Sequence, residues 1–448
     1  MSERTFDLLV IGAGMAGLAA ARKAASAGKR VAIADARPYG GTCALRGCDP
    51  KKVLVGAADI VDAQRRMRDH GVSGQARLDW PALMAFKRTF TEPVPDKLEA
   101  SLRDVGVTTL HGPTRFVGHE AAEVGTERVT AERFLIATGS RPRPLGIPGE
   151  DLVATSTEFL DLEALPARIV FIGGGYVSFE FAHLAARAGA QVIILHRGER
   201  PLQRFDPDHV DLLVRASRDL GIDVRLETET ASVDAQDGAR IVRTNDGDTL
   251  EADLVVHGAG RVPELADLDL PSGGIDEDPH GGVRVNEYLQ STTNPRAYAA
   301  GDAAATSGPP LTPVAVHEGI VAATNLLRGN QKRPEYAGTP SVVFTLPRLA
   351  FAGQSEVEAQ EQGLAFDVQS RDTSGWFSAR RTRHSFGASK VLVEKGSQRI
   401  LGAHLLGAHA DETIGIFALA IRHGLTARDL KTSILVHPSA ASDVASMV

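Results

Sequence analysis

The segment that decides the fold is Phe6-Asp-Leu-Leu-Val-Ile-Gly12-Ala-Gly14-Met-Ala-Gly17, near the start of a chain of 448 residues. Its apolar run is typical of a strand buried in a parallel sheet, and the Ala-rich stretch 18–27 has helical spacing. A strand, a Gly-x-Gly-x-x-Gly turn and a helix in this order predict a dinucleotide-binding unit. The following strand ends in Asp35, about twenty residues past the glycines, where such units hold a ribose hydroxyl.

The same arrangement returns later in the chain. The run Ala167-Arg-Ile-Val-Phe-Ile leads into Gly173-Gly-Gly175, and Glu180 stands in the slot of the third glycine. An Ala-rich helix and a second apolar strand follow. Two such units in one chain predict two bound dinucleotides.

The length exceeds what one hydrophobic core supports, so several domains are expected. Segments 132–142 and 254–263 each read as a strand followed by a glycine turn and a proline, which predicts that the second unit interrupts the first. From about residue 340 the pattern changes to alternating β-type segments with a helix over 413–423. We expect an α/β protein with two doubly wound Rossmann-like domains and an α+β C-terminal domain, divided as 1–148, 149–262, 263–335 and 336–448.

Composition narrows the class of partner. The net charge of -7 arises from interspersed acidic and basic residues, which disfavours a nucleic-acid groove or a membrane-binding face. The first residues lack the features of a signal peptide, and no apolar run is long enough to span a bilayer. A cytoplasmic enzyme acting on small molecules is expected.

The only two cysteines lie in Gly41-Thr42-Cys43-Ala-Leu-Arg-Gly-Cys48, shortly after the first glycine turn. Close thiol pairs in reducing compartments are more often catalytic or metal-binding than structural. A zinc site would need further ligands at a recognisable spacing, and two inert cysteines remain the plain alternative. The pattern favours a redox-active disulfide beside a dinucleotide, and no metal is expected.

In this order, the motifs GxGxxG, GGTCxxxxC, ATG, GxGxxE, GRxP, GD with LTPVA, and a terminal His-Pro resemble the class I pyridine nucleotide-disulfide oxidoreductases. This is the family of glutathione reductase, dihydrolipoyl dehydrogenase and mercuric reductase. The resemblance covers nearly the whole chain. It implies FAD, an FAD domain (1–148 and 263–335) split by an NAD(P) domain (149–262), and a dimerisation domain (336–448) that forms a homodimer.

The resemblance also assigns the cofactor sites. It implies that Asp35 holds the adenosine ribose of FAD, that Asp302 contacts the ribityl chain and that the helix opening at Thr312 points at the flavin. The other residues implied for FAD are Gly12, Gly14, Gly17, Gly41, Thr42, Thr138 and Gly139. Those implied for the nicotinamide cofactor are Gly173, Gly175, Tyr176, Arg197, Arg204, Gly260 and Arg261.

The implied mechanism passes electrons from the nicotinamide through FAD to Cys48, the flavin-proximal sulfur. Cys43 would be the exposed thiolate that attacks a substrate disulfide, because the thiolate is the nucleophile. His437, contributed across the dimer interface, would be the base. Lys51 and Glu180 would form an ion pair near the flavin.

The chain departs from the family at the position five residues after this histidine. The family places there a Glu that orients the base, and this chain has Ser442, followed by Asp443. Three alternatives stay open. Asp443 orients the base, Ser442 gives a weaker bond, or the base works without such a partner.

Cofactor choice depends on the end of the second unit's second strand, where NAD-specific members carry a carboxylate and this chain has His196-Arg197. A guanidinium pairs with a 2′-phosphate, which favours NADPH, although Gln203 stands at the second phosphate-binding position, beside Arg204.

The resemblance also bears on the disulfide substrate. Arg22 matches one glutathione-binding arginine of the family, but Ile320 stands at the position of the other. The missing arginine favours a low-mass disulfide other than that of glutathione.

Rival functions remain. They are a quinone or metal reductase or an oxidase fed directly by the flavin, a dihydrolipoyl dehydrogenase, and a flavoprotein whose redox state a partner reads.

Overall fold

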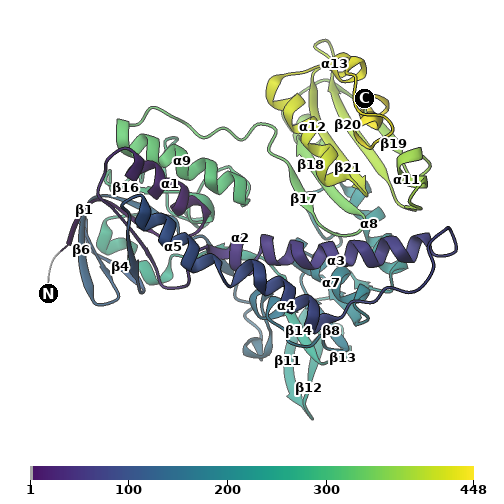
Figure 1. The fold of residues 1–448 in the computed structure, drawn as a ribbon, viewed down its shortest axis with the longest axis horizontal. Helices are drawn as coiled ribbons and strands as arrows, with labels where there is room; N and C mark the ends of the chain where they lie inside the picture. Colours follow the sequence, from purple (N-terminus) through teal and green to yellow (C-terminus); the bar gives the residue numbers. More distant parts are fainter. Residues whose placement is uncertain (1–3) are drawn as a thin grey trace. The chain divides into compact units, whose positions relative to one another are not determined.

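The computed structural model describes residues 4–448, which form two compact units (Figure 1). The first unit takes the chain up to Lys52, then Ala85–Arg143 and Arg261–Tyr336. The second takes the chain stretches between and after these, Val53–Met84, Pro144–Gly260 and Ala337–Val448. The expected division into domains at residues 148, 262 and 335 stays a prediction.

The first unit is built on a seven-stranded sheet around β1 (Arg4–Ile11). This strand pairs in parallel with β2 (Val31–Asp35) and with β6 (Glu127–Ile136), and β16 (Ala297–Ala299) joins beside β6. Leu9 and Val10 are fully buried, so both faces of β1 are covered, as its continuous apolar run predicts. The sheet is completed by β3 (Thr108–His111), β4 (Thr114–Gly118) and β5 (Ala121–Val124).

Two helices, α1 (Met15–Ser26) and α9 (Thr312–Arg328), pack side by side in this unit (Figure 1). They approach closely at Gly319, where an added Cβ would lie 2.3 Å from the carbonyl oxygen of Ala16. The unit also holds α2 (Gly41–Arg46), the start of α3 (Cys48–Met67), the end of α4 (Trp80–Thr91), α5 (Val94–Asp104), and the paired short strands β7 (Ser140–Pro142) and β15 (Arg261–Pro263).

The second unit contains the second doubly wound domain. Four parallel strands run in the order β10 (Asp223–Arg225), β9 (Gln191–Leu195), β8 (Arg168–Ile172) and β14 (Leu254–His257). Its helices are α6 (Ser156–Leu160), α7 (Tyr176–Arg187) and α8 (Pro207–Asp219), and an antiparallel sheet is formed by β11 (Thr230–Gln236), β12 (Ala239–Thr244) and β13 (Thr249–Ala252).

The C-terminal part of the second unit is a five-stranded antiparallel sheet packed by helices, which confirms the expected α+β class. The expected helix over 413–423 begins earlier, as α12 (Ala410–His423), because Asp411 and Glu412 suit the positive end of the helix dipole. The strands, in sheet order, are β17 (Ser341–Val343), β18 (Arg348–Gly353), β21 (Ile400–Gly407), β20 (Ala388–Glu394) and β19 (Phe366–Asp372). The other helices are α10 (Glu356–Glu361), α11 (Phe377–Arg380), α13 (Ala427–Thr432) and α14 (Val444–Met447).

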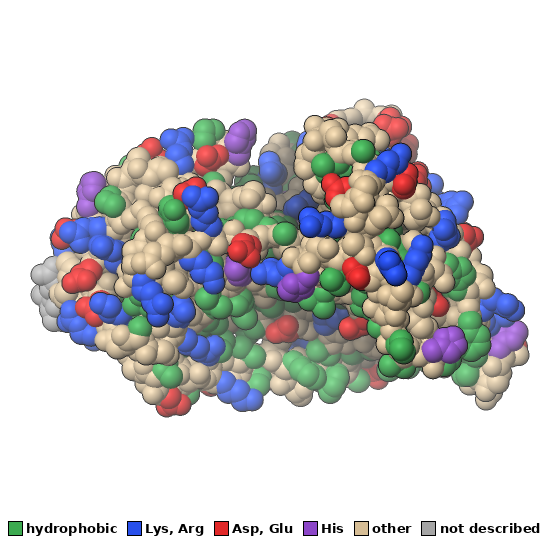
Figure 2. All heavy atoms as spheres, turned by 90° about the horizontal axis from the view of Figure 1, so that it is seen from above, with side chains coloured by type: hydrophobic (Ala, Val, Ile, Leu, Met, Phe, Trp, Pro, Cys, Tyr) green, Lys and Arg blue, Asp and Glu red, His purple; other side chains and the backbone are tan. Residues whose placement is uncertain are grey.

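Basic and acidic side chains are intermixed over the face seen in Figure 2, in keeping with the modest net charge. Among the helices of residues 4–448, none combines the length and the apolar composition needed to cross a membrane.

Candidate active site

The two cysteines lie together in the first unit. Cys43 lies within α2 and Cys48 is the first residue of α3, with the sharp turn at Gly47 between them. Both are free thiols in the structure, and a hydrogen bond joins them. Cys48 is exposed and Cys43 is half-buried, which differs from the expectation that Cys43 is the exposed thiol. The difference arises because Cys48 begins a new helix while Cys43 lies inside the preceding one.

The surroundings of the pair make its two sulfurs unequal. A hydrogen bond from Cys43, a contact of 3.5 Å with the hydroxyl of Thr312 and the positive charge of Lys51 lower the pKa of Cys48 from 9.0 to about 6. The same Cys43–Cys48 bond and burial raise the pKa of Cys43. The start of a helix also favours an anion at Cys48. The reduced pair therefore carries its negative charge on Cys48.

The first glycine turn forms an open cradle at the start of α1. A side chain at Gly17 would lie 2.0 Å from the carbonyl oxygen of Gly12, so only glycine allows this turn to close. A side chain at Gly14 would meet nothing nearer than the Cα of Gly41, at 4.0 Å. Helix α1 has no side-chain cap, which leaves its first N–H groups to an outside acceptor.

Asp35 lies where a ribose would be held, at the end of β2. Its carboxylate accepts hydrogen bonds from the backbone N–H of Ala13 at 2.8 Å and of Arg37 at 2.9 Å. These two bonds fix the side chain beside the glycine turn. The carboxylate retains lone pairs for ribose hydroxyls.

Further predicted residues follow the carboxyl ends of the neighbouring parallel strands β6 and β16, at the same edge of the sheet as Asp35. The hydroxyl of Ser140 donates to Asp302 at 2.7 Å and accepts from the guanidinium of Arg261 at 3.0 Å. The hydroxyl of Thr138 is buried and has no hydrogen-bond partner among the described residues. A buried hydroxyl without a partner is costly, so this atom is suited to bind a ligand. Gly139 follows with a φ of +73°.

The second glycine turn repeats the first. Gly173 has a φ of +105°, and a side chain there would lie 2.5 Å from Ala259. Gly175 precedes α7, which again has no side-chain cap, and Tyr176 at its first position is 46% exposed. This turn can hold a second pyrophosphate.

The loop after β9 carries the residues predicted to select the cofactor. The imidazole of His196 accepts a hydrogen bond from the N–H of Gly174 at 3.2 Å and lies 2.9 Å from the carbonyl oxygen of Arg200. Because a carbonyl only accepts, His196 is the neutral tautomer that donates from Nε2. Burial lowers the pKa of His196. Arg197 is highly exposed, and its one ion-pair contact among the described residues, with Glu229, is long at 3.8 Å. Arg204 is also exposed. Gly260, at the end of the stretch that follows β14, has a φ of +109°.

Two further predicted residues are fixed by hydrogen bonds to other elements of their own units. Glu180 is buried and accepts a hydrogen bond from the backbone N–H of Phe344 at 2.7 Å. It belongs to the second unit and Lys51 to the first, and their ion pair stays a prediction. Arg22 lies on α1 and donates to the hydroxyl of Ser101 at 3.2 Å.

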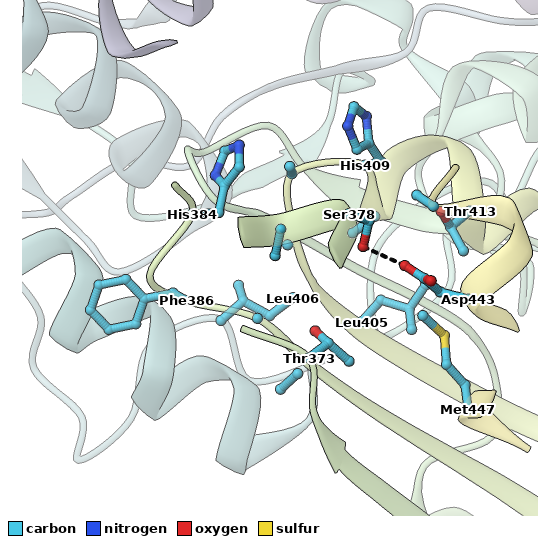
Figure 3. Close-up of a pocket in the computed structure, with 17 residues that line it drawn as sticks. Thr373, Ser378, His384, Phe386, Leu405, Leu406, His409, Thr413, Asp443 and Met447 are labelled. Atoms are coloured by element: carbon cyan, nitrogen blue, oxygen red, sulfur yellow. Dashed lines mark hydrogen bonds between the residues drawn. The ribbon is translucent and has the colours of Figure 1, made fainter. Parts of the chain in front are cut away.

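The residues after His437 are engaged elsewhere. The Asp443 carboxylate accepts a hydrogen bond from Ser378 and lines a cavity of about 60 Å³ that His384 and His409 also line (Figure 3). The Ser442 hydroxyl donates to the carbonyl of Ser439 at 2.7 Å. His437 itself is exposed. These bonds use part of the hydrogen-bonding capacity of each side chain, and the choice among the three alternatives for the base stays a prediction.

Sequence reasoning missed the partners that fix these residues. Ser140 joins Asp302 to Arg261, and Glu318 reaches the backbone of Gly301. The available signal for Glu318 was a charged residue in an apolar helix, one position before Gly319.

A separate cluster of three carboxylates surrounds the ammonium of Lys390 at 2.6 to 2.8 Å. Its members are Asp206, Asp208 and Glu356, and the ammonium at the centre makes it a salt-bridge cluster.

Comparison with known proteins adds the context for this geometry. Residues 6–319 match the family model described as pyridine nucleotide-disulphide oxidoreductase, and residues 339–448 match the dimerisation domain of that family. Glutathione reductase from Burkholderia cepacia is 34% identical over 444 residues, which cover 99% of this chain and 98% of the relative. Dihydrolipoyl dehydrogenase from Chlamydia muridarum is 32% identical over 447 residues, covering 98% and 95%.

One solved structure is similar over the full length. The Cu(II) complex of the HOCl-induced flavoprotein disulfide reductase RclA from Escherichia coli has a TM-score of 0.89 and 28% identity. The match covers 100% of this chain and 99% of that one.

Proposed function

Since this chain belongs to the pyridine nucleotide-disulphide oxidoreductase family, we propose that it uses NADPH to reduce a low-molecular-weight disulfide through Cys43 and Cys48. Membership makes it an FAD-dependent disulfide reductase that draws electrons from a nicotinamide dinucleotide. The choice of NADPH, the residue roles and the substrate are the parts proposed.

The observation that carries the proposal is the inequality of the two sulfurs. Cys48 has a pKa of about 6, while the pKa of Cys43 is raised. At neutral pH Cys48 is then held as the thiolate, whereas the Cys43 thiol must lose its proton before it can attack a substrate disulfide. The pair is thus arranged as one stored thiolate and one thiol that depends on a base.

The reaction with a substrate disulfide follows from this arrangement. His437 of the partner subunit takes the proton of Cys43, whose sulfur attacks one substrate sulfur, and the first thiolate leaves with that proton. The Cys48 thiolate then attacks Cys43, which releases the second substrate thiolate and forms the Cys43–Cys48 bond. The substrate gains the two electrons that the cysteine pair loses.

The first unit supplies residues that fit FAD. The uncapped start of α1 and the open space at Gly14 suit a pyrophosphate, Asp35 suits a ribose, and the buried hydroxyl of Thr138 still needs a partner. When bound, FAD supplies two-electron transfer from the nicotinamide to the cysteine pair. The chain's own part is to hold the cofactor and to keep Cys48 ionised.

NADPH is favoured by the loop after β9. His196 stands where NAD-specific members have a carboxylate, and its hydrogen bonds to Gly174 and Arg200 hold the loop that presents Arg197. An exposed guanidinium with only a weak contact can pair with a 2′-phosphate. Tyr176, exposed at the start of α7, would cover the flavin until the nicotinamide displaces it.

The proposal includes the organisation of the molecule. We assign 1–148 and 263–335 to an FAD domain, 149–262 to an NADPH domain and 336–448 to a dimerisation domain of a cytoplasmic homodimer. The family match over 339–448 supports the last assignment. Ile320 in place of a second carboxylate-binding arginine favours a disulfide other than that of glutathione.

Replacing Cys43 by Ser tests the function. NADPH consumption would be followed with a panel of disulfides that includes glutathione, cystine, γ-glutamylcystine and coenzyme A disulfides. The variant should still be reduced by NADPH, as seen from bleaching of the flavin absorbance, but should lose turnover with the disulfide that the unmodified enzyme prefers. Retained turnover would refute the disulfide pathway.

A second candidate is reduction of an oxidised metal ion, favoured by the solved Cu(II) complex of the similar RclA. Cu(II) belongs in the same panel. If the Cys43→Ser variant reduces Cu(II) as fast as the parent while no disulfide is turned over, the flavin serves the metal directly. A dihydrolipoyl dehydrogenase would instead show faster flavin reduction by NADH than by NADPH.

A further inference from the structure

A carboxylate with no role in the proposed chemistry is buried in the middle of α9. Glu318 is 1% exposed, although charged side chains are seldom fully buried without partners. Its Oε2 accepts the backbone N–H of Gly301 at 2.6 Å. Its Oε1 accepts the hydroxyls of Thr306 at 2.8 Å and Tyr336 at 2.5 Å. Three donors therefore converge on one carboxyl group, whose pKa is raised by burial.

The donors are themselves fixed in direction. The Thr306 hydroxyl oxygen accepts the N–H of Gly308 at 3.3 Å, so its proton points to Glu318. An added Cβ at Gly308 would lie 2.6 Å from the ring of Tyr336, which shows how tightly the ring is enclosed. A neutral amide at position 318 would direct its own N–H groups at one of these donors.

The chain segment that carries Tyr336 is fastened to the same helix. The side chain of Asn325 binds the backbone of Gln331 and Lys332, and the N–H of Glu335 donates to the ring of His317 at 3.1 Å. Tyr336 is the last residue of the first unit. Its hydroxyl is thus held in place by the fold.

Glu318 acts on the turn that precedes Asp302. Gly301 has a φ of +69°, and its N–H bond to Glu318 fixes the backbone there. Ser140 fixes the side chain of Asp302 at 2.7 Å. The two bonds together restrain the backbone before Asp302 and its side chain.

We propose that Glu318, held in place by Thr306 and Tyr336, is a positioning residue that sets Asp302 for binding FAD. The inference rests on the proposed contact between Asp302 and FAD. It adds that the FAD affinity of this chain depends on a buried carboxyl group outside the cofactor site.

The test measures the dissociation constant of FAD from protein stripped of its flavin, followed by quenching of FAD fluorescence on full-length variants. Glu318→Gln should weaken FAD binding about tenfold and Thr306→Val about threefold, because each change removes hydrogen bonds that hold the carboxyl group of residue 318. Thr306→Ser keeps the hydroxyl and should bind FAD like the parent. Glu287→Gln is the matched control. It removes an exposed carboxylate that pairs with Arg333, in the chain segment that also carries Tyr336.

The outcomes separate this inference from the proposed function. Equal FAD affinity in Glu318→Gln, Thr306→Val and the parent overturns it, and so does equal weakening by Thr306→Val and Thr306→Ser. If Glu318→Gln does not fold, as judged by circular dichroism and NADP⁺ binding, the other variants test the inference. Thr306→Val and Tyr336→Phe, which each remove one hydroxyl bonded to Glu318, should then weaken FAD binding, and Thr306→Ser should not. Asp302→Asn is included because normal FAD binding by that variant would overturn the proposed role of Asp302 itself.

Discussion

The sulfur of Cys48 lies 3.5 Å from the hydroxyl oxygen of Thr312, although 264 positions separate them in the chain. Cys48 begins α3 and Thr312 begins α9, so the thiol lies where two helices start. Sulfur accepts a hydrogen bond better as a thiolate than as a thiol. This contact therefore favours the ionised form of Cys48.

Replacing Thr312 by Val should raise the pKa of Cys48 from its value of about 6 by about one unit, because the thiolate loses one hydrogen bond. The pKa is measured on the reduced protein from the ultraviolet absorbance of the thiolate across a pH series. Thr312→Ser keeps the hydroxyl and should leave the pKa in place. An unchanged pKa in Thr312→Val would mean that Lys51 and Cys43 alone ionise Cys48.

Two glycines of one turn should respond differently to alanine. A Cβ at Gly14 meets no atom closer than 4.0 Å, so Gly14→Ala should fold normally yet lose FAD, because the methyl group occupies the cradle. A Cβ at Gly17 would lie 2.0 Å from the carbonyl of Gly12, so Gly17→Ala should be destabilised by about 3 kcal/mol or more. Urea unfolding of the flavin-free proteins measures the difference. Comparable destabilisation of both would show that the cradle is a packing feature.

Arg197→Ala should raise the KM for NADPH about tenfold and leave that for NADH unchanged, because only NADPH carries the 2′-phosphate. Steady-state rates of nucleotide oxidation, measured over a range of NADPH or NADH concentrations, give the two KM values. Arg215, an exposed arginine on α8 of the same unit, provides the control for a general loss of positive charge. If both nucleotides weaken equally, Arg197 does not read the phosphate.

The pH dependence of stability should include a contribution from His384. Burial, with the nearby Arg66, lowers the pKa of His384 from 6.5 to about 4 in the folded protein. Between these values the unfolded chain binds the proton more readily, so the free energy of unfolding falls as the pH drops from 6.5 to 4 and then levels off. The loss is on the order of 3 kcal/mol. In His384→Gln, urea unfolding across this range should show a shallower dependence, and an identical curve would refute the assignment.

Much of the architecture could be predicted from local pattern. The glycine turns predict both dinucleotide units, because positive φ and close backbone approach at Gly12 and Gly173 tolerate no side chain. The family match confirms the class and the family. The start of α12 was placed three residues late, since its charged first turn interrupts the apolar spacing.

The contacts that tune the site could not be predicted. Thr312 was assigned to the flavin, but its hydroxyl also reaches Cys48, and only the fold brings these distant positions together. The sequence offers Asp443 as a partner of the base, but the bond from Ser378 of α11 to Asp443 follows only from the fold (Figure 3). Side-chain partners far apart in sequence leave no periodic signal.

The place of β16 in the first sheet has a consequence for biosynthesis. This strand, Ala297–Ala299, pairs with β6, so the amino-terminal sheet stays incomplete until about 300 residues have left the ribosome, and α1 lacks the helix that packs on it until α9 ends at Arg328. Until then the nascent polypeptide carries β6 with part of its edge unpaired, a form exposed to aggregation and a natural client for chaperones.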